Sequence, residues 1–109
     1  MDGVVSPLAP TRDLERLVDG LCDALLTARD RDDMRRLLLD LCTPAEIRTL
    51  AERWHVARLL AETQLPYREI HDRTGVSTTT IVRVGRFLRQ EPHQGYRRAI
   101  EKLKAGHAV

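Results

Sequence analysis

The strongest constraint on the fold is a glycine turn between two short amphipathic stretches, in the segment REIHDRTGVSTTTIVRVGRFLRQ at residues 68–90. Gly75 can adopt the left-handed conformation that ends a helix, and Ser77 can cap the helix that follows. Two helices joined by a tight turn form a helix-turn-helix, whose second helix enters the major groove of DNA. The segment therefore predicts such a motif at about residues 66–89. The expected inward positions are Ile70, Thr74, Val76, Ile81 and Val84.

The second helix of this motif is expected to turn a basic, hydroxyl-bearing face outward. No acidic residue occurs between Asp72 and Glu91. A solvated helix usually pairs its arginines with nearby carboxylates, whereas arginine and threonine without them suit phosphates and base edges. A solvated arginine face with no partner is the alternative. At roughly 100° per residue, the outward residues are Thr79, Val82, Arg83 and Arg86, flanked by Thr78 and Arg89.

The rest of the chain also predicts helices, because Ala, Leu, Arg and Asp dominate while β-branched and aromatic residues are sparse. We expect an all-α fold of about six helices. Residues 1–10 mix Gly, Ser and two prolines without period, which predicts a disordered arm, and residues 11–109 are expected to form a single domain. A first helix is expected from Thr11, a second is capped by Asp30, a fourth begins at Pro66, and a sixth surrounds Tyr96.

A third helix is predicted from Thr43, because Pro44 suits the first helical position and Glu46 completes a capping box. Its apolar residues lie on one side at first, but Val56 and Leu59 extend to other sides. A helix that is apolar nearly all round must be enclosed on several sides. We therefore expect a second copy of the chain to cover it in a twofold-symmetric homodimer. Single exposed leucines are the alternative explanation.

The charge is distributed unevenly along the chain. Residues 1–42 carry six basic and nine acidic side chains, whereas residues 43–109 carry twelve and seven. Cys22 and Cys42 match neither a metal site nor a dense disulfide framework, so reduced thiols are expected. The sequence contains no signal-peptide pattern and no apolar run near the ~18 residues of a membrane span. We expect a cytoplasmic protein with no membrane partner.

The sequence does not predict an enzyme or a metal site. The four histidines are scattered, none pairs with a carboxylate at ligand or triad spacing, and no glycine-rich phosphate loop is present. We therefore expect no catalytic residue and no metal ligand.

Two stretches resemble the Trp repressor superfamily: DLCTPAEIRTLAERW at residues 40–54 and LPYREIHDRTGVSTTTIVRVGRFL at residues 65–88. Within it they are most similar to the Trp-repressor-related YerC/YecD group, which has similar DLCT, RW and TGxSTxTIxRV patterns. GYRRAIEKL at residues 95–103 resembles the last helix of that group more loosely. The resemblance implies an interlocked helical homodimer that reads a palindromic operator in double-stranded DNA.

The resemblance also implies an effector pocket between the third helix and the second helix of the helix-turn-helix, which we call the reading helix. Val84 stands where Trp repressor has a glycine that leaves space for the indole. Overfilling a packed site costs about 1–3 kcal/mol, so dependence on L-tryptophan is not expected, while another small effector stays open. The positions that match the pocket are Thr43, Arg53, Thr80, Arg83 and Val84. Arg83 is expected to serve as a DNA contact or structural partner instead.

Together these patterns predict a sequence-specific transcription regulator, specifically a dimeric repressor. The alternative is a helical protein-interaction module of the same fold that has lost operator binding. Arg68, His71, Thr78, Thr79 and Val82 match the DNA-contacting positions of the family, and Arg83 and Arg86 join them from the outward face. His71 departs from the common motif, in which a small residue usually occupies this place.

Overall fold

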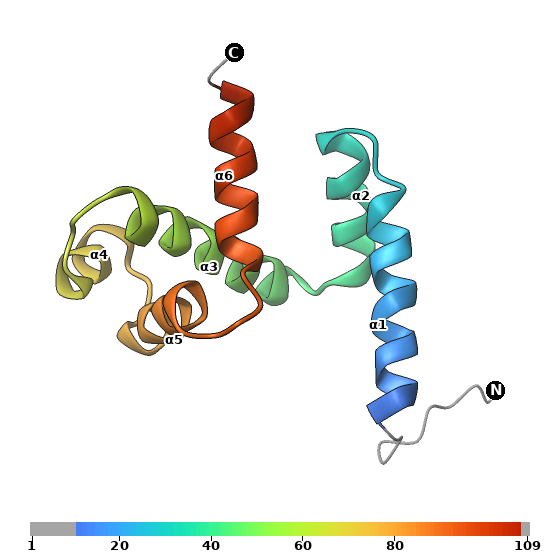
Figure 1. Cartoon of the computed structure of the whole chain (residues 1–109), viewed down its shortest axis with the longest axis horizontal. Coiled ribbons are helices and arrows are strands. Elements are labelled where there is room, and N and C mark those ends of the chain that lie inside the picture. The colour runs from blue at the N-terminus through green and yellow to red at the C-terminus, as the bar shows by residue number, and fades with distance from the viewer. Residues whose placement is uncertain (1–10, 108–109) are drawn as a thin grey trace. The chain divides into compact units, whose positions relative to one another are not determined.

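The computed structural model describes residues 11–107, which form six α-helices and no strand (Figure 1). The predicted all-α fold of six helices is therefore confirmed. Contacts divide the chain into two units that meet between Thr43 and Pro44. The disordered arm predicted at residues 1–10 lies outside the described residues. That residues 11–109 act as a single domain remains a prediction.

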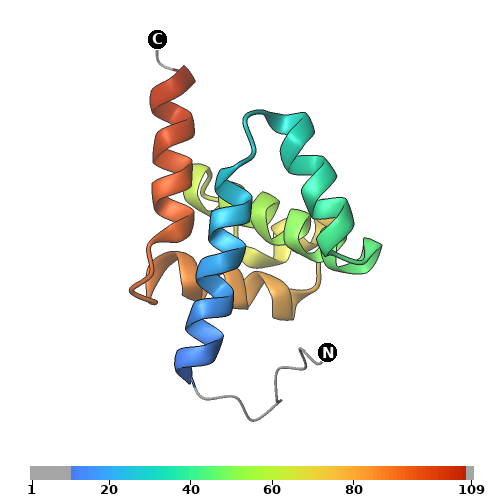
Figure 2. The same ribbon diagram turned by 90° about the vertical axis from the view of Figure 1, so that its right-hand side faces the viewer.

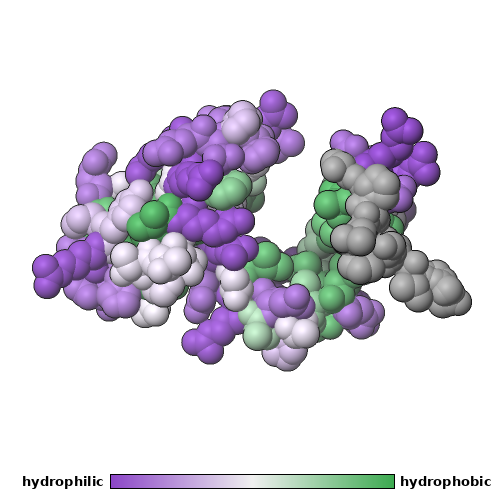
Figure 3. Space-filling model, turned by 90° about the horizontal axis from the view of Figure 1, so that it is seen from below, coloured by the Kyte–Doolittle hydropathy of each residue, from purple (hydrophilic) through white to green (hydrophobic). Residues whose placement is uncertain are grey.

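The first unit contains α1 (Thr11–Leu26) and α2 (Arg31–Leu41). Asp30 caps α2 as predicted, because the backbone N–H of Asp33 donates to its Oδ1 at 2.8 Å. No residue of α2, and none at positions 12–26 of α1, is buried. Hydrophobic surface is accordingly visible on this unit (Figure 3). Its exposed apolar residues include Leu14, Leu17, Val18, Leu21 and Leu39.

The second unit contains α3 (Pro44–Glu62), α4 (Tyr67–Thr74), α5 (Thr78–Arg89) and α6 (Gly95–His107). The most extensive contact joins α3 to α5, while α4 packs on α5, and α6 packs on both α3 and α5. The second half of α6 extends beyond the other helices of this unit, as two perpendicular views show (Figure 1, Figure 2). The buried core comprises Val56, Ala57, Leu60, Ile70, Val76, Ile81, Val84, Leu88 and Ile100.

The two halves of α3 differ in what covers them. Val56 and Leu60, in the second half, are buried in the core of the unit. Trp54 is half-buried and lies 6.3 Å from Tyr96, measured between ring centroids, so it joins α3 to α6. Leu50, in the first half, is 47% exposed. The second half of α3 therefore anchors the unit, and the first half leaves apolar surface open.

The helix-turn-helix is present where the sequence predicts it. Gly75 follows α4 in the left-handed conformation, with φ 75°, and its N–H donates to the carbonyl of His71 at 2.9 Å. Ser77 caps α5, because its Oγ accepts from the backbone N–H of Thr80 at 3.1 Å. Pro66 is the residue before α4 rather than its first member. Four of the five expected inward residues are buried, and the fifth, Thr74, is half-buried.

Replacing Gly75 with valine should destabilise the fold by about 1–3 kcal/mol, because a β-branched side chain is strained at a positive φ. Thermal unfolding followed by circular dichroism measures this loss. Gly106→Ala provides a control, since Gly106 lies in α6 with nothing within 4 Å of an added Cβ, and it should not lower the melting temperature. Unchanged melting of the Gly75 variant would contradict the assigned turn.

Candidate nucleic-acid interface

The outward face of α5 is polar, basic and accessible. Ile81, Val84 and Leu88 are buried on the inner side of the helix. The opposite side is exposed, including Val82 at 51%. Seen from below, the surface over the α4–α5 region is mostly hydrophilic to weakly polar (Figure 3). The exposed predicted contacts on this helix are Thr78, Thr79, Val82, Arg83 and Arg86.

The arginines of α5 differ in their partners from four arginines elsewhere among residues 11–107. Four ion pairs at i,i+4 spacing connect an arginine to a carboxylate on its own helix: Arg36–Asp32, Arg48–Glu52, Arg58–Glu62 and Arg73–Glu69. The hydrogen bond from Arg58 holds the pKa of Glu62 below its usual value. Since α5 has no acidic residue, its arginines cannot be neutralised in this way.

Arg83 lies over the ring of Phe87, with its guanidinium carbon 4.2 Å from the ring centroid. His93 also stacks on Phe87, at 6.0 Å between centroids and 15° between planes. Stacking of this kind orients a guanidinium while leaving its N–H groups available as donors. Arg83 is therefore held in place by an aromatic contact rather than by a carboxylate.

Arg86 has a partner that the sequence pattern did not predict. Its Nε donates to Glu91 Oε2 at 3.1 Å, although Glu91 lies beyond the end of α5. His93 Nε2 lies 3.7 Å from Glu91 Oε1, so the Glu91 carboxylate faces the guanidinium of Arg86 with one oxygen and the imidazole of His93 with the other. The expectation of an acid-free face is thus wrong at this point, because the chain after α5 brings Glu91 back to the helix. The side chain of Arg86 is nevertheless 63% exposed.

Arg68 and His71 lie one turn apart on α4, and both are exposed. The Nδ1 of His71 is 2.7 Å from the carbonyl oxygen of Val76, across the turn. Because a carbonyl only accepts, Nδ1 carries the proton in this hydrogen bond, and Nε2 remains for another partner. His71 therefore closes the turn with a side-chain hydrogen bond in the place where other motifs pack a small residue.

Most residues expected to line an effector pocket already contact other residues of the protein. Val84 is fully buried, and Arg83 is stacked on Phe87. The hydroxyl of Thr80 lies 2.9 Å from Ser77 Oγ in the cap of α5. Arg53 is half-buried, and its Nε has no hydrogen-bond partner among residues 11–107. Thr43 is an exposed residue of the first unit.

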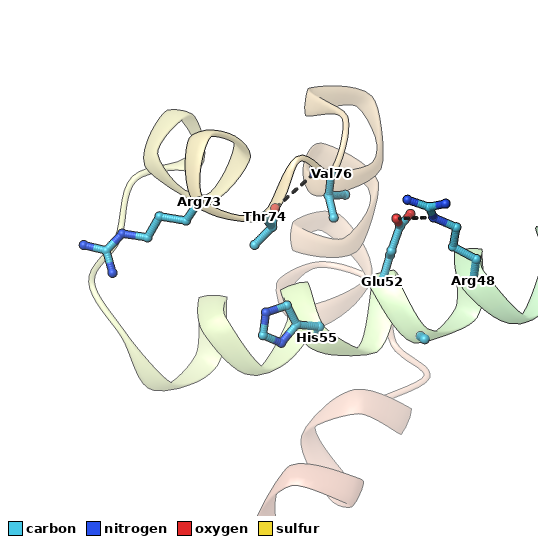
Figure 4. Close-up of a pocket in the computed structure, with 7 residues that line it drawn as sticks. Arg48, Glu52, His55, Arg73, Thr74 and Val76 are labelled. Carbon is cyan, nitrogen blue, oxygen red and sulfur yellow. Dashed lines mark hydrogen bonds and ion pairs between the residues drawn. The ribbon is translucent and has the colours of Figure 1, made fainter.

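A groove that the sequence did not predict lies between α3 and the turn of the motif. Its water-accessible volume is about 500 Å³. Figure 4 shows the side chains that line it. Glu52 and Arg48 pair with each other across one turn of α3, and Thr74 donates to the carbonyl of Ile70, so these lining groups are already satisfied. The groove is lined by Arg48, Ala51, Glu52, His55, Arg73, Thr74 and Val76.

No helix within residues 11–107 is long and apolar enough to cross a membrane.

These features define a helix-turn-helix unit with an exposed cationic helix, and known proteins share it. The family model for Trp repressor protein matches residues 16–104. The uncharacterised protein YerC of Bacillus subtilis (strain 168) is 39% identical over 87 residues, which cover 80% of this chain and 82% of YerC.

Solved structures agree with the sequence comparisons. A TrpR-like protein from Eubacterium eligens ATCC 27750 superposes with a TM-score of 0.75 at 38% identity, covering 82% of this chain and 90% of that one. A structure from Staphylococcus aureus gives the same TM-score at 32% identity, covering 82% and 87%. The chain belongs to the Trp repressor family, and the resemblance stated from the sequence is confirmed.

Glu91→Gln should strengthen binding to duplex DNA, because Glu91 neutralises Arg86 in the free protein and would repel phosphates. We expect a gain of about twofold to fivefold at low salt, measured by fluorescence anisotropy, from the size of a surface ion pair. The gain should shrink as salt is added. Glu101→Gln, on α6, is the matched control and should change binding less.

Proposed function

We propose that this protein is a sequence-specific DNA-binding transcription regulator, acting as a dimeric repressor. The observation that carries the proposal is the exposed face of α5, which has arginines and threonines but no carboxylate of its own helix. Such a helix fits the major groove with its N-terminal residues against base edges. Membership in the Trp repressor family supports the same function.

The proposed contacts have distinct roles. Arg83 and Arg86 supply paired donors for guanine or phosphate, and Thr78 and Thr79 supply hydroxyls at the N-terminal end of α5. Val82 supplies an apolar contact for a thymine methyl group. Arg68 and His71 come from α4, which packs on α5. We propose that they contact the DNA backbone at the edge of the groove.

A homodimer is supported by the apolar surface that each chain leaves exposed. The apolar stripe on α1, formed by Leu14, Leu17, Val18 and Leu21, would be costly to keep in water, as would Leu50 on α3. A second copy of the chain is the simplest cover for this surface. Two reading helices related by a twofold axis would match a palindrome with half-sites about 34–36 Å apart. We propose that this dimer acts in the cytoplasm.

An effector such as L-tryptophan is not part of the proposal. Val84 is fully buried in the core, and Arg83 already stacks on Phe87. A ligand entering between α3 and α5 would have to displace both side chains. We propose that the reading helix is held in place by the protein's own residues.

Operator binding is the direct test. A library of random duplexes selected on the protein should converge on a palindrome, and Arg86→Ala should weaken binding to it by roughly tenfold or more, the value of one good base or phosphate contact. Arg36→Ala, which removes another exposed, ion-paired arginine, from α2, should have little effect. Adding L-tryptophan should not change the affinity.

Failure of the library to converge at moderate salt would contradict sequence-specific binding. Retained binding to a protein partner after removal of Arg83 and Arg86 together would instead favour the alternative, an interaction module of the same fold. An enzymatic role has no support from the site.

Oligomeric state is tested separately by light scattering after size-exclusion chromatography. The wild-type protein should have the mass of two chains, about 25 kDa for chains of 12.5 kDa each. Leu17→Glu should shift the mass toward one chain, because a charge in the apolar stripe of α1 opposes burial. Glu15→Gln on the same helix should leave the dimer intact. A wild-type monomer at micromolar concentration would refute the dimer.

A further inference from the structure

Gly85 lies in the middle of α5 and is buried, although glycine is a poor helix former. A Cβ at this position would collide with the hydroxyl of Tyr67 and would lie 3.1 Å from its Cζ. The next neighbour, Leu60 Cδ1, is at an ordinary 3.7 Å. Gly85 is therefore required by one close approach, that of the first residue of α4 to the reading helix.

The same tyrosine hydroxyl is bound by Arg89, the last residue of α5. Arg89 Nη1 donates to Tyr67 Oη at 3.3 Å, and Arg89 Nη2 donates to the carbonyl oxygen of Leu60 at 3.3 Å. Leu60 lies in the last turn of α3, where carbonyl groups have no partner within the helix and a cation is favoured. One guanidinium thus connects α3, α4 and α5.

We infer that Tyr67, Gly85 and Arg89 form a lock that fixes the angle of the reading helix, and that Arg89 is a positioning residue rather than a phosphate contact. This inference rests on the proposed function for its consequence, since the angle matters when α5 lies in a groove. Base recognition requires side chains held within about 0.5 Å and 10–20° of the productive geometry. The sequence pattern placed Arg89 at the edge of the DNA-facing side, and its hydrogen bonds direct it to the scaffold instead.

The first test measures folding alone and uses the close approach at Gly85. Gly85→Ala should lower the melting temperature of the wild-type protein, because the new methyl group meets the Tyr67 hydroxyl. In a Tyr67→Phe background that hydroxyl is gone and only the 3.1 Å approach of Cζ remains, so the same substitution should cost clearly less, since alanine also favours helix. This smaller loss of stability is the expected result. An equal loss of stability in both backgrounds would contradict the close approach of the Tyr67 hydroxyl to Gly85.

Gly20→Ala is the matched control for this test. Gly20 lies within α1, and nothing is within 4 Å of an added Cβ. Its effect on melting should therefore be the same in the wild-type and Tyr67→Phe backgrounds. A background-dependent effect at Gly20 would overturn the interpretation of the smaller loss at Gly85.

The second test separates positioning from charge at Arg89. Tyr67→Phe, which removes one hydrogen bond, should weaken binding to the selected operator by roughly fivefold to tenfold, at a temperature where the variants are folded. Arg89→Gln, which removes two, should weaken it by at least as much. The double variant should lose no more affinity than the weaker-binding single variant, because both substitutions open the same lock. Additive losses would overturn the shared role.

Salt dependence completes the second test. If Arg89 bound a phosphate, Arg89→Gln would reduce the slope of log K against log salt by about 0.9, whereas substitution of a positioning residue leaves the slope like that of Tyr67→Phe. Arg86→Ala is the comparison, since Arg86 is proposed to touch DNA. If wild-type protein binds no operator at all, the proposed function fails, while the melting experiment still decides whether the lock exists.

Discussion

Burial of one side of α5 against the second half of α3 is the interaction on which the rest of the unit depends. Ile81, Val84 and Leu88 enter the same core as Val56 and Leu60, and each such side chain contributes about 1.5–3 kcal/mol when removed from water. Because α5 has only one buried side, this packing decides which residues turn outward. The exposed arginines and threonines are therefore a consequence of where the apolar residues go.

The arginines of this chain show how one residue type takes different roles according to its neighbours. On α2, α3 and α4, arginines pair with a carboxylate one turn away, as Arg73 does with Glu69. On α5 no such carboxylate exists, so Arg83 stacks on Phe87 and Arg89 binds α3 and α4. Only Arg86 meets an acid, and it comes from beyond the helix. Their local partners thus distinguish the arginines proposed to contact DNA from those that bind other parts of the protein.

The two units of the chain also differ in how much of their apolar surface they bury. The second unit has a core of nine buried residues, which accounts for a stable helix-turn-helix. The first has no buried residue at positions 12–41, and most of its leucines remain exposed. This exposed apolar surface is the basis of the proposed homodimer, in which a second copy of the chain covers it. In that proposal, recognition and assembly belong to different helices.

The sequence alone determined the helices, the turn and the family, because capping residues, helical periodicity and a left-handed glycine act over a few residues. Asp30, Ser77 and Gly75 lie where their chemistry predicts. The tertiary structure decided which arginines are available. Glu91 reaches Arg86 only through the bend after α5, and the need for glycine at position 85 appears only when Tyr67 approaches from α4. The first contact depends on the path of the chain after α5, and the second depends on how α4 packs on α5, and no local pattern encodes either.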